Sequence, residues 1–372
     1  MKKLCIITYK YNNEWWIEKV VRNLIEWLIN EYEIHVITSE VKDIQDNRII
    51  FHEVKLFTNF WILRWIQFFF FSYFKFKKLN KIHNFDLIHK HATSLIKSNF
   101  FTAHSVYREA LKNNIKLQKW IIKKLKYFIF SLYPLAILFE YINLKRSKKI
   151  IAISTGIKEE LISNYKINSN KIIIIPNGIN IKDCPSIQKK YDNNLNLIFV
   201  WKRFKAKWLD IAIEAINIVV NKNKIRDLKL FIVWYDEIEF EIYNNKVNNL
   251  KLENNIIFIW HTKNIYKYYN LSHIFILPTY YEAFWMVIIE AAICWLAILT
   301  SKTQWPKDLI KNWYNWYLLE RDPKVYADKI IKLYNNKNLL QTLWNNARKH
   351  VIENYSWDKI IEKHIKLYNN IS

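Results

Sequence analysis

Glycine is nearly absent from this chain of 372 residues, which contains only Gly156 and Gly178. An average usage of about 7% would give roughly 26 glycines in a chain of this length. Turns in which φ is positive normally use glycine, because a side chain is strained there. Tryptophan, by contrast, occurs 17 times. Several tryptophans, including Trp15-Trp16, Trp313 and Trp316, stand where the neighbouring residues predict tight turns.

Cysteines and long hydrophobic runs are also scarce. The three cysteines are odd in number and unclustered, which predicts neither a disulfide framework nor a metal site and leaves a reduced setting as the default. The apolar run after Lys2-Lys3 is far too short for a signal peptide. The run 128–139 contains Pro134 and is too short to cross a bilayer. We therefore expect a cytoplasmic protein, either soluble or peripheral on the inner face of the plasma membrane.

Acidic residues are few relative to basic ones. The chain has 57 lysines and arginines against 33 acidic residues, a net charge of +24. Such a field favours polyanions, either nucleic acid or an anionic membrane surface. The length is sufficient for two α/β domains with full cores.

The most informative stretch is 277–297, LPTYYEAFWMVIIEAAICWLA. The apolar run His273–Leu277 predicts a buried parallel strand, and Met286–Ala292 has the spacing of a helix packed on a sheet. Glu282 would then lie in the loop after the strand, and Glu290 about two turns along the helix. Ligands bind at this edge of open α/β sheets, and the free amides at a helix start suit a phosphate. The stretch predicts a sugar-nucleotide site.

This stretch resembles the E-x7-E signature of glycosyltransferase family 4, retaining enzymes of the GT-B fold, although Trp285 replaces a family glycine. The resemblance covers nearly the whole chain and implies an α/β protein with two Rossmann-like domains facing across a cleft. Residues 1–177 would form the N-terminal acceptor-side domain, and residues 178–354 the C-terminal nucleotide-sugar-binding domain. A C-terminal helix, 355–372, would pack back on the first domain.

The resemblance also implies roles for residues of the second domain. Glu290 would hydrogen-bond the nucleotide ribose, and Glu282, a candidate catalytic residue, would hold hydroxyls of the donor sugar. Lys207 would neutralise the leaving diphosphate together with Arg203 or Lys202, two choices that the register of this basic loop leaves open. The phosphates would also be bound by the helix-start amides of Ala283, Phe284, Trp285 and Met286.

In the first domain, the resemblance points to two further positions. His104 ends a strand where family members carry a histidine near the transferred sugar, and Trp15-Trp16 stand in a loop that faces the donor. Residues 86–91 (DLIHKH) resemble the family's D-x-I-H-x-H element. For its histidines, His89 and His91, we favour a structural role over acceptor contact. The string Pro176–Asn180 (PNGIN) resembles the family's linker between the two domains.

Replacing certain tryptophans by glycine restores the family pattern throughout the chain. We therefore interpret the gene as one from a lineage that decodes UGA as glycine, translated here with UGA as tryptophan. The alternative, a genuinely tryptophan-rich protein, stays open, and Trp357 matches the family as tryptophan. The positions that fit glycine are Trp15, Trp16, Trp201, Trp208, Trp234, Trp260, Trp285, Trp295, Trp305, Trp313 and Trp316.

Two segments of the first half, 57–81 and 116–149, are both aromatic and basic. Apolar helix faces that carry Lys and Arg suit an anionic membrane interface, although two core helices with solvated basic edges would share this pattern. The expected partners are a nucleotide-sugar donor, a sugar or lipid-linked acceptor of the cell envelope, and an anionic membrane surface. No metal or other cofactor is implied, and we do not expect nucleic acid as a partner.

Two other classes remain open. A GT-B epimerase would act on the nucleotide-sugar without an acceptor. A non-catalytic polyanion-binding protein becomes the better interpretation if the tryptophans are genuine, because Trp285 and Trp15-Trp16 would then fill the donor cleft.

Overall fold

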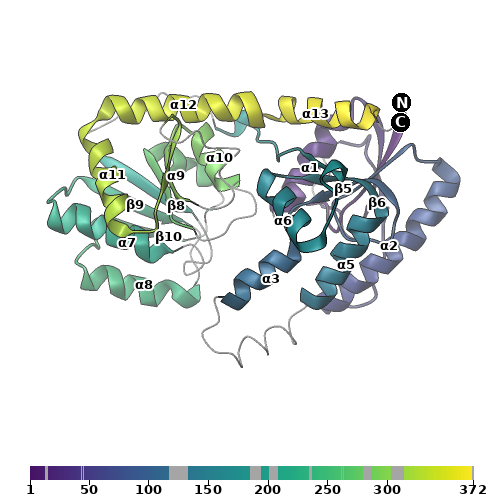
Figure 1. Cartoon of the computed structure of the whole chain (residues 1–372), viewed down its shortest axis with the longest axis horizontal. Coiled ribbons are helices and arrows are strands. Elements are labelled where there is room, and N and C mark those ends of the chain that lie inside the picture. Colours follow the sequence, from purple (N-terminus) through teal and green to yellow (C-terminus); the bar gives the residue numbers. More distant parts are fainter. Residues whose placement is uncertain are drawn as a thin grey trace. The chain divides into compact units, whose positions relative to one another are not determined.

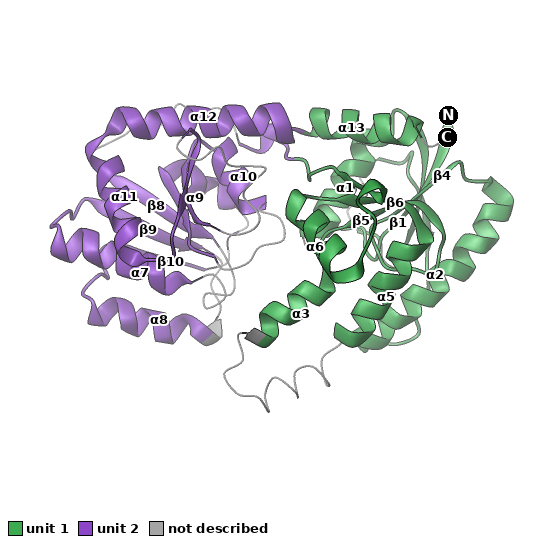
Figure 2. Cartoon of the chain, viewed as in Figure 1, with its two compact units in different colours: residues 1–178, 357–372 green, residues 179–356 purple. Residues whose placement is uncertain are grey.

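The computed structural model divides the chain into two compact units (Figure 2). Unit 1 comprises residues 1–178 and 357–372, and unit 2 comprises residues 179–356. These limits differ from the predicted domain boundaries by one or two residues. The structure describes residues 1–12, 16–42, 44, 46–116, 133–184, 194–200, 208–233, 237–260, 262, 264–279, 286–302 and 314–370.

Unit 1 contains a sheet in which all pairings are parallel (Figure 1). The described strands follow the order β3-β2-β1-β4-β5-β6-β7. Helices on both faces cover the central strands, so β1 and β5 are buried along most of their length. The strands are β1 (Lys2–Ile7), β2 (Tyr32–Thr38), β3 (Ile50–Glu53), β4 (Leu87–Lys90), β5 (Ser98–Ala103), β6 (Ser147–Ala152) and β7 (Ile172–Ile174).

The helices of unit 1 are amphipathic to different degrees. Helix α1 buries one face, including Val21, Ile25 and Leu28, against the sheet and α13, as the helical spacing of its apolar residues predicts. Helix α2 buries far less of its length. The helices are α1 (Trp16–Leu28), α2 (Trp61–His83), α3 (Tyr107–Lys116), α5 (Tyr133–Arg146), α6 (Thr155–Tyr165) and α13 (Trp357–Asn369), with a 3-10 turn η1 (Ser169–Lys171).

Gly178 and Trp357 mark the two places where the chain leaves and re-enters unit 1. A Cβ atom added at Gly178 would lie 2.4 Å from Cδ2 of the Trp357 indole, closer than any real contact. Trp357 is itself almost fully buried. The glycine in the string PNGIN is therefore needed because an aromatic ring covers its α-carbon.

Unit 2 is also built on a sheet with only parallel pairings, whose described strands follow the order β10-β9-β8-β11-β12-β13. The strands are β8 (Leu195–Val200), β9 (Leu228–Val233), β10 (Ile256–Ile259), β11 (Ile274–Leu277), β12 (Ala297–Ser301) and β13 (Trp316–Leu319). The helices are α7 (Leu209–Asn217), α8 (Glu237–Asn249), α9 (Ile265–Leu271), α10 (Met286–Ile293), α11 (Pro323–Asn335) and α12 (Lys337–Tyr355), with shorter turns η2 (Ile181–Asp183) and η4 (Ile218–Lys222). The predicted α/β class is confirmed in both units.

The expectation of no disulfide was wrong. Cys184 and Cys294 form a disulfide, with their Cα atoms 5.6 Å apart although 110 residues separate them in the sequence. Cys184 follows η2 and Cys294 follows α10, so the disulfide joins the ends of these two elements. Cys5 stays free and buried in β1, and burial raises the pKa of its thiol. The cysteines therefore no longer argue for a reduced compartment.

Among the helices that the structure describes, none combines the length and the apolar character needed to cross a bilayer.

Candidate functional site

His104 directly follows β5, at the carboxyl edge of the sheet of unit 1. Its buried side chain places Nε2 3.2 Å from Nδ1 of His91, which follows β4 at the same edge. Trp16, the first residue of α1, packs edge-on against the His104 ring, with the ring centroids 5.7 Å apart. The structure thus brings the predicted site residues Trp16 and His104 together and adds His91 to them.

Burial sets the protonation of this pair. Desolvation lowers the pKa of His104 to about 4, and desolvation and the neighbouring histidines lower the pKa of His91 well below its usual value. Both imidazoles are therefore neutral at pH 7. A neutral imidazole offers one donor and one acceptor nitrogen, which suits hydrogen bonding to hydroxyl groups.

A cavity of about 10 Å³ lies beside these two histidines. Its lining includes His91, His104 and Asn177, whose Nε2, Nδ1 and Nδ2 atoms are buried and have no hydrogen-bond partner among the described residues. A volume of this order holds about one water molecule, and unpaired buried polar groups are costly. This end of unit 1 can therefore hold one water molecule against three polar atoms.

His89 differs from His91, although both belong to the same element. Its two ring nitrogens are already engaged, Nδ1 with the Tyr368 hydroxyl at 2.6 Å and Nε2 with the Thr102 hydroxyl at 2.7 Å. His89 thereby ties β4 to β5 and to α13, which fits the structural role that we favoured for it.

In unit 2, Glu290 lies on α10, which follows β11 as predicted. Its side chain is half-buried, and the Tyr269 hydroxyl of α9 donates to its Oε2 at 3.3 Å and to the Val287 carbonyl at 3.4 Å. Burial and then the charge of Glu290 raise the pKa of Tyr269 well above its usual value, so the phenol keeps its proton. Tyr269 therefore holds the Glu290 carboxylate in place.

A second tyrosine extends this arrangement. The Tyr266 hydroxyl donates to Oδ2 of Asp183 at 3.4 Å, and burial, followed by the charges of Glu290 and Asp183, raises the pKa of Tyr266. Asp183 precedes Cys184, whose disulfide reaches the residue after α10. Neither tyrosine nor the disulfide was predicted to take part in the site, because the sequence offers no spacing that links α9, η2 and α10.

Most of the predicted donor-binding residues lie outside the described part of the chain. The exception at the start of α10 is Met286, which is half-buried. The residues for which no structure is described are Glu282, Ala283, Phe284, Trp285, Lys207, Arg203, Lys202 and Trp15.

Two tryptophans adopt backbone conformations that normally belong to glycine. Trp208 has φ 56° and precedes α7, and Trp295 has φ 61° and follows α10. The other described residues with positive φ are one asparagine and three lysines, namely Asn84, Lys166, Lys224 and Lys251. A bulky aromatic residue in this region is an outlier, because its Cβ crowds the following carbonyl.

Two protein-family models match this chain, one in each half. Residues 17–183 match the model of Glycosyltransferase Family 4, and residues 180–350 match that of Glycosyl transferases group 1. The capsular polysaccharide biosynthesis glycosyltransferase CapM of Staphylococcus aureus is 30% identical over 261 residues, 67% of each chain. An Escherichia coli UDP-Gal:alpha-D-GlcNAc-diphosphoundecaprenol alpha-1,3-galactosyltransferase is 23% identical over 235 residues, 60% of each chain.

Among solved structures, WaaG, a glycosyltransferase involved in lipopolysaccharide biosynthesis, superimposes with a TM-score of 0.76 at 17% identity. The match covers 98% of this chain and 99% of that one. The two parallel-sheet units are thus those of the GT-B fold. The chain belongs to the glycosyltransferases, with a family-4 domain in its first half and a group-1 domain in its second.

Proposed function

We propose that this glycosyltransferase moves a sugar from a nucleotide-sugar to a lipid-linked acceptor of a cell-envelope glycan, with retention of the anomeric configuration. The observation that carries the proposal is the hydrogen bond between Tyr269 of α9 and Glu290 of α10, the helix that follows β11. A carboxylate held at this edge of a parallel sheet can accept hydrogen bonds from the hydroxyls of a ribose. The relatives named above act on envelope polysaccharides or lipid-linked sugars, which supports the same substrate class.

Further roles in the donor site rest on the resemblance to the family. Glu282 would hold donor-sugar hydroxyls, the amides of residues 283–286 would bind the phosphates, and Lys207 with Arg203 or Lys202 would neutralise the departing diphosphate. We assign no nucleophile, because a front-face displacement needs none.

The acceptor side would involve His104. Its imidazole is neutral at pH 7, and it lies beside Trp16 and His91 at the carboxyl edge of unit 1. A neutral histidine can align a hydroxyl by hydrogen bonding without placing a positive charge near the anomeric carbon, where positive charge develops during transfer.

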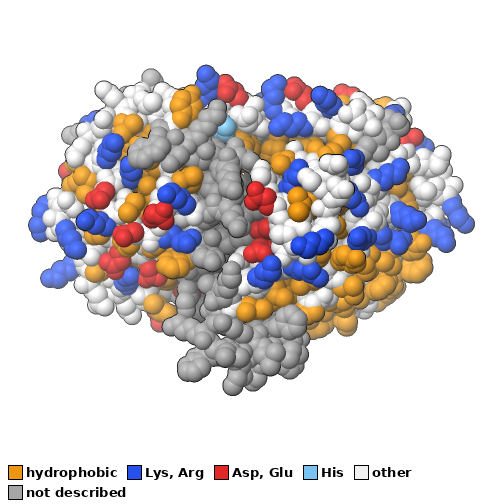
Figure 3. Space-filling model, viewed as in Figure 1, with side chains coloured by type: hydrophobic (Ala, Val, Ile, Leu, Met, Phe, Trp, Pro, Cys, Tyr) orange, Lys and Arg blue, Asp and Glu red, His pale blue; other side chains and the backbone are white. Residues whose placement is uncertain are grey.

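The acceptor's lipid would be met at a membrane surface. Helix α2 exposes large apolar side chains, among them Trp61, Phe74 and Ile82, each more than 60% exposed. Lys77, Lys78 and Lys81 are exposed on the same helix. Figure 3 shows hydrophobic side chains gathered over the region of α2 and α5, with lysines and arginines beside them. Aromatic and basic side chains together suit the interface of an anionic bilayer.

We also propose that at least some tryptophans replace glycines of the natural protein. The positive φ of Trp208 and Trp295 supports this interpretation, because both positions fit glycine in the family pattern. In contrast, Trp344 is buried on α12 and donates its indole N–H to the His273 carbonyl at 2.8 Å, as expected of a genuine tryptophan. Peptide masses from protein made in its own host would test the proposal, and tryptophan masses at 208 and 295 would refute it.

The enzymatic proposal is tested by transfer assays with a panel of UDP-, GDP- and ADP-sugars and a polyprenyl-diphosphate sugar as acceptor. The chain is assayed as printed and with glycine at the positions that fit it.

Glu290→Gln should lower kcat/KM by about 10–100-fold, because a charge-assisted hydrogen bond is lost. Glu362→Gln, a matched change at an exposed position of α13, should leave kcat/KM unchanged. Altered free nucleotide-sugar without any acceptor would favour an epimerase, and salt-sensitive nucleic-acid binding without turnover would favour a binding protein.

Membrane docking is tested separately by co-sedimentation with vesicles. Binding to vesicles containing an anionic phospholipid should exceed binding to phosphatidylcholine vesicles, and serine at Lys77, Lys78 and Lys81 should weaken it. Equal binding to both vesicle types, together with undiminished transfer to a water-soluble acceptor, would contradict the lipid-linked proposal.

A further inference from the structure

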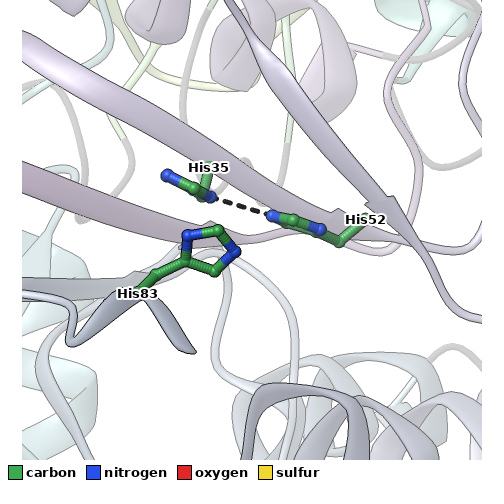
Figure 4. Close-up of side chains that lie close together, drawn as sticks. All are labelled: His35, His52 and His83. Carbon is green, nitrogen blue, oxygen red and sulfur yellow. Dashed lines mark hydrogen bonds between the residues drawn. The ribbon is translucent and has the colours of Figure 1, made fainter. Parts of the chain in front are cut away.

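Three histidines from three elements of unit 1 converge on one point (Figure 4). His35 lies within β2, His52 lies on the neighbouring β3, and His83 is the last residue of α2. Each ring contributes one nitrogen to the cluster, and these three nitrogens lie within 4.8 Å of one another. His35 is fully buried, whereas His52 and His83 are half-buried, so the cluster is open on one side.

Hydrogen bonds orient the central ring. Nε2 of His35 lies 2.9 Å from Oε1 of Glu33, and its Nδ1 lies 2.9 Å from Nε2 of His52. The carboxylate can only accept, so His35 donates from Nε2, and the Nδ1 lone pair of a neutral ring faces His52. Metal-binding histidines typically donate their second ring nitrogen to a carboxylate in this way, which fixes the tautomer.

The spacing is close to what a metal ion requires. Tetrahedral zinc with Zn–N bonds of about 2.0–2.1 Å places neighbouring ligand nitrogens about 3.3 Å apart. The His35–His52 pair, at 2.9 Å, would need to open by a few tenths of an ångström. His83 is half-buried at a helix end and can close the remaining distance by rotating its side chain. Binding would displace the Nε2 proton of His52 that hydrogen-bonds to His35, and the neutral His52 ring would carry its proton on Nδ1 instead.

The electrostatic environment keeps the rings in the form that binds metals. Burial, with the neighbouring rings and Lys75 as smaller causes, lowers the pKa of His52 to about 4. Burial also lowers the pKa of His35, against the opposing effect of Glu33. Lys3 places its Nζ 3.9 Å from Oε1 of Glu33 and also acts on His35, lowering its pKa slightly. Two rings are thus neutral at pH 7, with a carboxylate behind them.

The cluster is distinct from the candidate transfer site. His35 and His52 lie on β2 and β3, at one edge of the sheet of unit 1, and His83 ends α2. His91 and His104 follow β4 and β5, which lie on the other side of β1. A metal here would tie the edge strands to the end of α2, the helix that carries the exposed apolar side chains.

We propose that His35, His52 and His83 bind one divalent transition-metal ion of the zinc class, with Glu33 positioning His35 and water completing the coordination. Imidazole ligands suit Zn²⁺, Co²⁺, Ni²⁺ and Cu²⁺, and a set of three leaves a position for solvent. The bound ion fastens the end of α2 to the β2–β3 edge of the sheet.

The proposal is tested on the full-length chain without a histidine tag, freed of metal with a chelator. Titration with Co²⁺, followed by visible absorption, should saturate at one equivalent with the intense d–d bands of a tetrahedral site, and Zn²⁺ should displace it. His52→Gln together with His83→Gln should abolish this signal. Glu33→Gln should weaken binding by about 10–100-fold while leaving the stoichiometry unchanged.

His350→Gln, on α12 of unit 2, is the matched control and should bind as the parent does. Circular dichroism of the metal-free variants shows whether they are folded. If the double variant is folded and still binds one equivalent, the ion goes to other histidines and the proposal is wrong. The absence of saturable binding by the folded parent would refute it equally.

Discussion

The substitution Gly178→Ala should destabilise unit 1, because the added methyl group has no space. The new Cβ would lie 2.4, 2.6 and 2.8 Å from three atoms of the Trp357 indole, which is buried and cannot swing away freely. Overpacking of this kind typically costs about 1–3 kcal/mol. With about 2–4 °C per kcal/mol for a unit of this size, Tm should fall by roughly 2–12 °C.

A double-mutant cycle isolates the contact. Trp357→Leu alone should be destabilising, because it leaves a cavity. In the Trp357→Leu background, Gly178→Ala should leave the free energy of unfolding almost unchanged. Scanning calorimetry of the parent, both single variants and the double variant gives the coupling, expected at about 1–3 kcal/mol. Gly156→Ala, within α6, is the control and should be neutral or slightly stabilising. An equal cost of Gly178→Ala with and without Trp357 would refute the steric account.

Three further predictions concern other parts of the chain. Trp208→Gly should raise the free energy of unfolding by about 1 kcal/mol by relieving its positive φ, whereas Trp208→Ala should not, as urea titration would show. Burial raises the pKa of Glu140 from 4.5 to about 7, so the folded state holds an extra proton and loses stability as pH rises between these values. Glu140→Gln should remove this loss, worth about 3 kcal/mol by pH 8, in unfolding curves measured at several pH values. Tyr269→Phe should lower kcat/KM by about tenfold in the transfer assay with little change in Tm, because it frees the Glu290 carboxylate.

The sequence predicted the local parts of this fold well. The strand before Pro278 and the helix that begins at Met286 were found because continuous apolar runs and helical spacing are local signals. The same local pattern placed Glu290 on that helix and His104 at the end of a strand, and the structure has them on α10 and directly after β5.

Contacts between distant elements could not be predicted from the sequence. The Cys184–Cys294 disulfide joins residues that are 110 positions apart in the sequence, and nothing in the spacing of these cysteines predicts the pairing. The Gly178–Trp357 contact likewise depends on where the final helix returns to unit 1. His52 and His83 meet only because β3 is the edge strand beside β2 and α2 ends close to both.

The most direct test of the proposed function is the anomeric configuration of the first product, followed by proton NMR from an α-linked nucleotide-sugar. The measurement uses the chain with glycine at the positions that fit it and a polyprenyl-diphosphate sugar as acceptor. The proposal predicts an α-linked product whose formation depends on Glu290. A β-linked product, or α-linked product formed at an undiminished rate by Glu290→Gln, would contradict it.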